Sequence, residues 1–188
     1  MKIVSETEAI SILRNGGVGV LPTDTVYGLV ACANNPEAVA RLYALKHRER
    51  KPGTIIAASV EQLIELGVEE RYLHRVEKWW PASLSVETPL GAQLAYLHQD
   101  TGRQGVRVAA DERVRRILKQ TGPLATSSAN QPGKPHSNTV REAFEHFEDT
   151  VDFYVDGGDL STNAPSTLIK ISPDNTIEVI RQGAVRID

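Results

Sequence analysis

The chain has 188 residues, a formal net charge of −3, 40% hydrophobic residues and 24% charged residues. These values are typical of a soluble globular protein and favour one domain over residues 1–188, with nucleic-acid binding limited to a local patch. No apolar stretch approaches the ~20 residues that cross a bilayer, and the N-terminus lacks a hydrophobic signal segment, so we expect a cytoplasmic protein without a membrane partner. The single cysteine, Cys32, excludes an internal disulfide and is predicted to be a small buried side chain.

The N-terminal part of the chain predicts helices and strands in alternation. A capping box at residues 5–8 begins a helix that stops at Gly16 and Gly17. The apolar run 18–21 predicts a buried strand that ends at Pro22, because proline cannot donate to a sheet ladder. Asn35 as a cap, followed by a proline in the first turn, predicts the second helix.

The rest of the chain continues the same alternation, which is typical of an α/β fold. Predicted strands cover residues 54–58, 84–87, 105–108, 124–126 and 151–155, and predicted helices cover 59–66, 69–80, 111–119 and 139–147. Residues 88–104 give no clear pattern, and we expect a loop that contains a strand. Residues 166–171 and 177–181 predict a closing hairpin around a turn at 173–175.

The stretch 22–28 follows directly on a predicted strand and combines hydroxyls, a carboxylate, a phenol and a glycine. In open α/β sheets ligands bind beyond the carboxyl ends of strands, so this stretch fits a small polar ligand. The alternative is a plain Thr/Asp turn in which Gly28 is a flexible joint. Residues 127–133 likewise place small polar groups just past a strand.

Positive charge is concentrated at three further places. Residues 46–51 form a basic run that fits either a solvated helix end or an anion clamp. Arg107 lies in an apolar strand and needs a partner, which is either a structural carboxylate or a bound anion. A helix face with Arg113, Arg115, Arg116 and Lys119 fits a solvated surface or a local nucleic-acid patch.

The sequence lacks the common phosphate-binding and esterase motifs, G-x-x-x-x-G-K-[ST], G-x-G-x-x-G and G-x-S-x-G, and its histidines share no metal-ligand spacing. The candidate site residues are therefore hydroxyl and amide side chains at strand ends, together with cationic side chains. They are Thr23, Thr25, Ser128, Asn130, Ser166, Thr167, Lys46, Arg48, Arg107 and Arg181. Such a set has no covalent nucleophile, and it fits phosphoryl or nucleotidyl transfer, in which anions must be brought together.

Five motifs in one order resemble the YrdC/TsaC family of threonylcarbamoyl-adenylate synthases. They are Leu-Pro-Thr-Asp-Thr-Val-Tyr-Gly-Leu at 21–29, Lys-His-Arg at 46–48, Ser-Ser-Ala-Asn at 127–130 with Gly133, Ser-Thr at 166–167 and Ile-Arg-Gln-Gly at 180–183. The resemblance implies a twisted mixed sheet with flanking helices around a concave cleft. It also implies a nucleotidyltransferase that converts L-threonine, bicarbonate and ATP to threonylcarbamoyl-AMP and pyrophosphate. That product serves the threonylcarbamoyl modification of adenosine 37 in tRNAs, which a separate transferase complex completes.

The resemblance also implies roles for individual residues. Thr25, Arg107 and Ser166 would bind threonine, with backbone contacts from Thr126, and Arg107 would hold the carboxylate. Lys46 and Arg48 would bind the phosphates and act in catalysis, and Arg181 would bind ATP. Ser128 and Asn130 would lie near the nucleotide and its Mg²⁺, and no side chain is predicted as a dedicated metal ligand.

The chain departs from the usual family pattern at residues 49–54, 81–85 and 108–111, which affects the threonine side more than the nucleotide side. Two other functions are considered. One is a non-catalytic module that binds tRNA or duplex RNA through the basic patches. The other is a related carbamoyl-adenylate enzyme with a different acceptor or a different carbamoyl donor.

Overall fold

The computed structural model describes residues 1–172 and 176–187, so the predicted turn at 173–175 lies outside the described residues. The helices are α1 (Glu6–Arg14), α2 (Pro36–Leu45), α3 (Val60–Leu66), α4 (Glu70–Leu73), α5 (Ala95–His98), α6 (Glu112–Thr121) and α7 (Val140–Phe147), with short 3₁₀ turns at Glu77–Trp79, Ala92–Leu94 and Glu148–Thr150. The strands are β1 (Gly19–Pro22), β2 (Tyr27–Cys32), β3 (Thr54–Ala57), β4 (Leu84–Pro89), β5 (Arg103–Val108), β6 (Leu124–Ser128), β7 (Phe153–Tyr154), β8 (Thr167–Ile171) and β9 (Ile177–Arg181).

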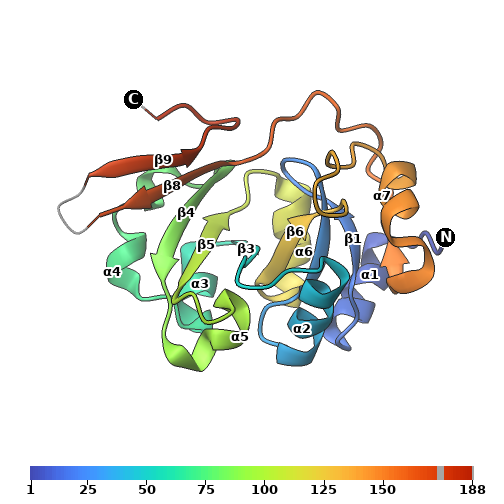
Figure 1. Cartoon of the computed structure of the whole chain (residues 1–188), viewed down its shortest axis with the longest axis horizontal. Coiled ribbons are helices and arrows are strands. Elements are labelled where there is room, and N and C mark those ends of the chain that lie inside the picture. Colours follow the sequence, from blue (N-terminus) through green and yellow to red (C-terminus); the bar gives the residue numbers. More distant parts are fainter. Residues whose placement is uncertain (173–175, 188) are drawn as a thin grey trace.

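The strands form one mixed sheet in the order β7-β1-β2-β6-β3-β5-β4-β8-β9. The pairs β1–β7, β3–β5 and β4–β8 are parallel, and the other neighbouring pairs are antiparallel. Figure 1 shows the twisted sheet running across the molecule, with β8 and β9 at one side and β1 near the other. The predicted α/β fold with a twisted mixed sheet and flanking helices is confirmed.

Helices pack on both faces of the sheet. The apolar sides of α2, α3, α5 and α7 join one large core cluster with β2 and β6, which includes Leu42, Leu63, Leu97 and Phe147. The second cluster lies on the opposite face, where α1 and α6 contribute Leu13 and Leu118. Cys32 belongs to this second cluster, and burial raises the pKa of its thiol to about 11. The prediction of a small buried cysteine is confirmed.

The N-terminal signals of several helices act as predicted. Ser5 and Glu8 form a reciprocal capping box on α1, and Asn35 accepts a hydrogen bond from the backbone N–H of Ala38 at the start of α2. Asp111 caps α6 in the same way. These caps fix where each helix begins, so they also fix the lengths of the loops that enter the site.

Four sequence predictions differ from the structure. Residues 88–104, expected to form a loop that contains a strand, also hold a 3₁₀ turn at Ala92–Leu94 and the helix α5. The strand β2 was not predicted, and Gly28 lies inside it rather than at a flexible joint. The helix predicted over 69–80 is wrong as a continuous element, because only Glu70–Leu73 is α-helical and a separate 3₁₀ turn follows at Glu77–Trp79. The strand predicted over 151–155 is limited to the two residues Phe153–Tyr154.

Gly28 is required where β2 approaches β6 and the turn before β2. A side-chain Cβ at this position would lie 2.6 Å from the Thr126 hydroxyl oxygen and 3.0 Å from a methyl carbon of Thr23. Both contacts are closer than an ordinary van der Waals contact. The glycine therefore allows the hydroxyl-bearing segments of the first motif and of β6 to lie against each other.

Candidate active site

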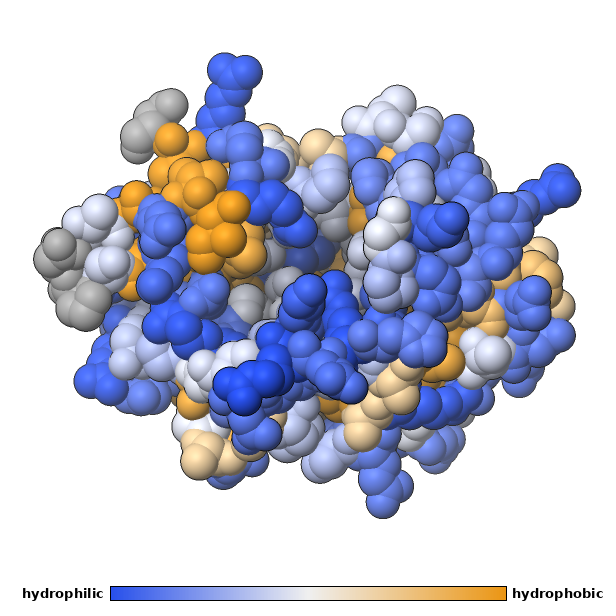
Figure 2. Space-filling view, in the orientation of Figure 1, coloured by the Kyte–Doolittle hydropathy of each residue, from blue (hydrophilic) through white to orange (hydrophobic). Residues whose placement is uncertain are grey.

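A cavity of about 580 Å³ is lined by residues of the neighbouring strands β2, β6, β3, β5, β4, β8 and β9 and of the loops next to them. Figure 2 shows the same face of the molecule, which is mostly hydrophilic around a central hollow and carries an apolar patch at β8 and β9. The cavity brings together eight of the nine predicted site residues. They are Thr25, Arg48, Arg107, Thr126, Ser128, Asn130, Ser166 and Arg181. Lys46, the ninth, does not line the cavity.

The wall formed by β5 carries a buried ion pair between Arg107 and Asp24. The Nη2 atom of Arg107 lies 2.6 Å from Asp24 Oδ1 and its Nε atom lies 3.3 Å from Oδ2, and the two side chains are 4% and 1% exposed. Burial alone raises the pKa of the Asp24 carboxyl, but the charge of Arg107 and hydrogen bonds from Arg107 and Ala110 outweigh burial and lower it. The partner of Arg107 that the sequence left open is thus a structural carboxylate.

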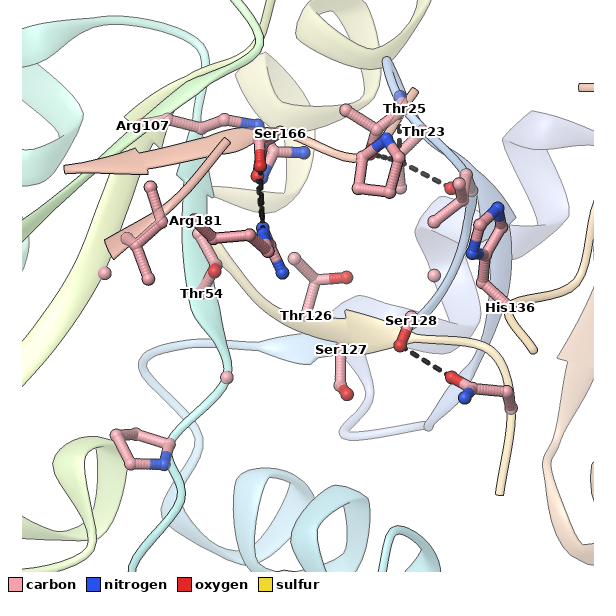
Figure 3. A pocket seen from close by; sticks show the side chains of 18 of the residues that line it. Thr23, Thr25, Thr54, Arg107, Thr126, Ser127, Ser128, His136, Ser166 and Arg181 are labelled. Carbon is pink, nitrogen blue, oxygen red and sulfur yellow. Dashed lines mark hydrogen bonds between the residues drawn. The ribbon is translucent and has the colours of Figure 1, made fainter. Parts of the chain in front are cut away.

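Ser166 and Arg181 lie next to Arg107 in the same part of the cavity (Figure 3). The Nε and Nη2 atoms of Arg181 donate to the Ser166 carbonyl oxygen at 3.1 and 2.8 Å, and Nη2 also donates to the Ser166 hydroxyl at 3.0 Å. The Ser85 hydroxyl donates to Ser166 Oγ at 3.2 Å from behind. Partial burial and the nearby charge of Arg107 lower the pKa of Arg181. Two guanidinium groups therefore lie close together at one end of the cavity.

The residues that follow β6 form a tight polar turn. The Ser128 hydroxyl donates to Asn130 Oδ1 at 2.6 Å, and Asn130 Nδ2 donates to the Lys134 carbonyl oxygen at 2.6 Å. These bonds fix both side chains of the Ser-x-Asn motif at the cavity wall. Lys134 and His136, which follow in the same loop, also line the cavity.

Lys46 lies behind this turn and is 3% exposed. Its ammonium group donates to the Ser128 carbonyl oxygen at 2.7 Å, to Asn130 Oδ1 at 3.1 Å and to the Asn130 carbonyl oxygen. Burial and the charge of Arg48 lower the pKa of Lys46 from 10.5 to about 8. The structure thus connects Lys46 to the site through Ser128 and Asn130. The reading of this lysine as part of a solvated helix end is wrong.

Arg48 extends toward the cavity from the segment after α2. Its Nη1 atom donates to the carbonyl oxygens of Lys51 and Pro52, both at 3.0 Å, which folds the segment back along the cavity. Burial lowers the pKa of Arg48, with a further contribution from Arg181. Residues of the loop 49–54, one of the places where the chain departs from the family pattern, continue this part of the wall.

Positive charge dominates the cavity. Arg48, Arg181 and Lys134 line it, and two further lining arginines are paired with carboxylates, Arg107 with Asp24 and Arg103 with Glu87. Several hydroxyl groups accompany these cations, and Figure 3 shows Thr25, Thr126 and Ser128 around the same space. Cations with surrounding hydroxyls favour an anionic ligand that is oriented by hydrogen bonds.

Sequence reasoning missed some of the lining residues. Lys134 and His136 were not among the predicted site residues, yet both line the cavity. Ser127 also lines it, and its buried hydroxyl has no hydrogen-bond partner among the described residues. Asp24 was noted in the first motif without a role, and only its position beside Arg107 shows why a carboxylate is present there.

The basic face of α6 is partly used within the molecule. Arg113 pairs with Glu6, and Arg115 donates to the carbonyl oxygens of Ala109 and Ala110. Arg116 and Lys119 are exposed. The nucleic-acid patch considered from the sequence is therefore reduced to two free side chains on this helix. Among the described residues, no helix combines the length and apolar character needed to cross a membrane.

Comparison with known proteins agrees with this arrangement. The family model Sua5_yciO_yrdC, described as "Telomere recombination", matches residues 11–183. This chain belongs to the Sua5/YciO/YrdC family. The resemblance noted from the ordered motifs is thereby confirmed.

Relatives in this family are named as synthases. The threonylcarbamoyl-AMP synthase of Coxiella burnetii is 33% identical over 172 residues, which cover 87% of this chain and 91% of the relative. The threonylcarbamoyl-AMP synthase of Vibrio campbellii is 31% identical over 185 residues, covering 94% and 97% of the two chains.

Solved structures of the family share the fold. P. abyssi Sua5 complexed with L-threonine superposes with a TM-score of 0.83 at 27% identity. The match covers 97% of this chain but 56% of that protein, so this chain spans little more than half of Sua5. YciO of E. coli has a TM-score of 0.80 at 22% identity, covering 97% and 92% of the two chains, which shows the shared fold.

Proposed function

We propose that this chain is an L-threonylcarbamoyl-adenylate synthase, a nucleotidyltransferase that converts L-threonine, bicarbonate and ATP to threonylcarbamoyl-AMP and pyrophosphate. The names of its relatives and the threonine bound to P. abyssi Sua5 support this function. The product would be consumed by a separate transferase complex that modifies adenosine 37 of tRNAs reading ANN codons.

One observation carries the proposal. Residues from widely separated motifs line a single cavity, and the cationic side chains of Arg48, Arg107 and Arg181 are among them. Arg107, with Thr25 and Ser166 near it, suits the carboxylate and hydroxyl of a small amino acid. Arg48 and the Ser128–Asn130 turn suit a nucleotide triphosphate, and Arg181 lies near Arg107 and between the two groups of residues (Figure 3).

The proposed reaction has two steps. The threonine amine, after loss of a proton, combines with bicarbonate to give a carbamate and water. A carbamate oxygen then attacks the α-phosphorus of ATP, the bond to the β-phosphate oxygen breaks, and pyrophosphate leaves. The protein contributes by holding the two anions in line, because fixed positive charge at Arg48 and Arg181 offsets their repulsion.

Mg²⁺ is expected as the partner of the triphosphate. This ion usually binds one or two protein oxygens together with phosphate oxygens and water, and the Ser128 hydroxyl oxygen at the cavity wall fits that pattern, whereas Asn130 Oδ1 already accepts hydrogen bonds from Ser128 and Lys46. No cluster of three or more His, Cys, Asp or Glu side chains occurs in the described residues that could bind a metal ion without a nucleotide. Bound Mg²⁺ would neutralise part of the phosphate charge.

The experiment that tests the proposal measures pyrophosphate release by the pure protein. With ATP, L-threonine, bicarbonate and Mg²⁺ together, we expect release well above reactions that lack threonine or bicarbonate. Release that does not depend on threonine would reject the threonine reaction and favour the carbamoyl-adenylate enzyme with a different acceptor. Absence of release, together with tRNA binding, would favour the RNA-binding module.

A further inference from the structure

Asp24 is the only carboxylate that the structure pairs with Arg107 among the described residues, and neither side chain reaches bulk solvent. A buried ion pair of this kind seldom stabilises a fold more than apolar residues would, so its presence needs another explanation. The cavity beside it supplies one, because Arg107 lines that cavity.

The geometry of the pair decides which part of the guanidinium remains for a ligand. Asp24 accepts hydrogen bonds from Nε and Nη2, which form one edge of the planar group. A guanidinium has five N–H donors in a rigid fork, so the edge formed by Nη1 and the second Nη2 hydrogen is not used by Asp24. That edge can bind both oxygens of a second carboxylate.

Asp24 is itself held in place from two sides. Its Oδ2 atom accepts hydrogen bonds from the Ala110 backbone N–H at 3.2 Å and from the Ser83 hydroxyl at 3.3 Å. These two donors come from segments 81–85 and 108–111, where the chain departs from the usual family pattern. With its oxygens already hydrogen-bonded and its side chain 1% exposed, Asp24 is poorly placed to bind the ammonium group of a substrate.

We propose that Asp24 is a positioning residue that turns the free edge of Arg107 toward the cavity and so selects a substrate with a carboxylate. This inference rests on the proposed function, because it assumes that the amino acid binds at the Arg107 end. The carboxylate of the substrate is recognised by the planar arrangement of the two N–H donors on the free edge of Arg107. Charge contributes less, because the charge of Arg107 is already balanced by Asp24. Ser83 and Ala110 hold the Asp24 carboxylate in this position through their hydrogen bonds to Oδ2.

The test is Asp24→Asn, which keeps the size of the side chain and removes its charge. We expect the KM for threonine to rise by about tenfold or more, with the KM for ATP within about twofold, since charge-assisted hydrogen bonds of this kind are among the strong ones. A role based on charge alone predicts the opposite sign, because removing a negative charge beside Arg107 would tighten binding of an anion. A lower or unchanged KM for threonine therefore overturns the inference.

Calorimetric binding of L-threonine and of L-threoninol, which lacks the carboxylate, gives a second readout. The unaltered protein should prefer threonine, and Asp24→Asn should reduce that preference by about tenfold. A preference that stays the same would contradict the role of Asp24, whereas equal affinity for both compounds in the unaltered protein would contradict carboxylate selection at this site.

Asp152→Asn is the matched control, because Asp152 forms a 2.7 Å ion pair with Arg41 away from the cavity, and it should leave both KM values unchanged. Ser83→Ala keeps the Asp24 carboxylate and removes one hydrogen-bond donor to it, so it tests the same role even if Asp24→Asn does not fold. We expect the KM for threonine to rise by about two- to threefold in this variant. An unchanged KM would count against the proposal. Failure of the unaltered protein to bind threonine rejects the proposed function as well, whereas normal binding with unaffected variants rejects only the role of Asp24.

Discussion

Lys46 gives the sharpest prediction about how the fold supports the site. Its buried ammonium group is bonded to two backbone carbonyl oxygens and one amide oxygen of the turn at Ser128–Asn130. Lys46→Met keeps the length of the side chain and removes all of these bonds. Leaving buried acceptors without a donor costs about 1–3 kcal/mol each, and relief from burying the charge offsets part of this cost. We expect a net loss of about 2–3 kcal/mol in the free energy of unfolding.

A loss of that size should lower the melting temperature by about 4–12 °C for a chain of this length, as measured by calorimetry or circular dichroism. Activity should fall by far more than stability, because the turn carries two residues proposed to contact the nucleotide. Lys51→Met in the same segment is the control, since Lys51 is exposed and its side chain has no partner among the described residues. The reasoning is refuted if Lys46→Met melts at the same temperature as the unaltered protein.

The pKa of Lys46 adds a pH signature to the same experiment. The folded protein releases the Lys46 proton near pH 8, whereas the unfolded chain holds it to about pH 10.5. Between these values the unfolded state binds more protons, so the Lys46 contribution to the free energy of unfolding rises with pH across this window. Denaturation series at pH 7 to 10 should show this rise in the free energy of unfolding for the unaltered protein and lack it for Lys46→Met. The same change of the unfolding free energy with pH in both proteins would contradict the lowered pKa.

Three further variants test other parts of the structure. Gly28→Ala places a methyl group 2.6 Å from a hydroxyl oxygen of β6, so we expect a loss of about 1–3 kcal/mol in denaturant unfolding; an unchanged midpoint would contradict the close approach. Arg48→Ala should raise the KM for ATP by about tenfold while threonine binding stays within about twofold, and equal effects on both ligands would argue against separate ends of the cavity. Arg116→Glu combined with Lys119→Glu should leave pyrophosphate release unchanged, because these exposed side chains lie outside the cavity; loss of activity would indicate that this face of α6 matters for catalysis.

Local signals predicted much of the fold. Caps such as Ser5, Asn35 and Asp111 depend on side chains within three residues of the backbone groups they satisfy, so they can be recognised in one sequence. The hairpin of β8 and β9 was also predicted from its alternation and confirmed. The strand β2 was missed because its first residues belong to a polar motif that was interpreted as either a ligand-binding stretch or a turn. The apolar run that continues to Cys32 was the available signal.

The helix predicted over 69–80 failed for a different reason. Leu73, Val76 and Trp80 have helical spacing, but a short helix followed by a separate 3₁₀ turn can present the same spacing to a core. Leu73 and Val76 are fully buried, so the apolar pattern was real although the element was not continuous. Spacing alone does not report whether the backbone between two apolar positions stays helical.

The candidate site depends on contacts between distant segments. Arg107 and Asp24 are 83 positions apart, and a single sequence contains no information on which carboxylate an arginine in a strand will meet. The approach of Lys46 to the turn at Ser128–Asn130 likewise requires the sheet order, which places β6 between β2 and β3. The list of site residues could therefore be proposed from motifs, whereas the way each residue acts could not.

The central claim is that one cavity binds a small amino acid and a nucleotide side by side. The most direct test is a crystal structure of the protein with L-threonine, Mg²⁺ and a non-hydrolysable ATP analogue. We expect the threonine carboxylate on Arg107 and the triphosphate between Arg48 and the Ser128–Asn130 turn, with the amine directed toward the α-phosphate. Density for either ligand outside this cavity, with the cavity itself empty, would contradict it.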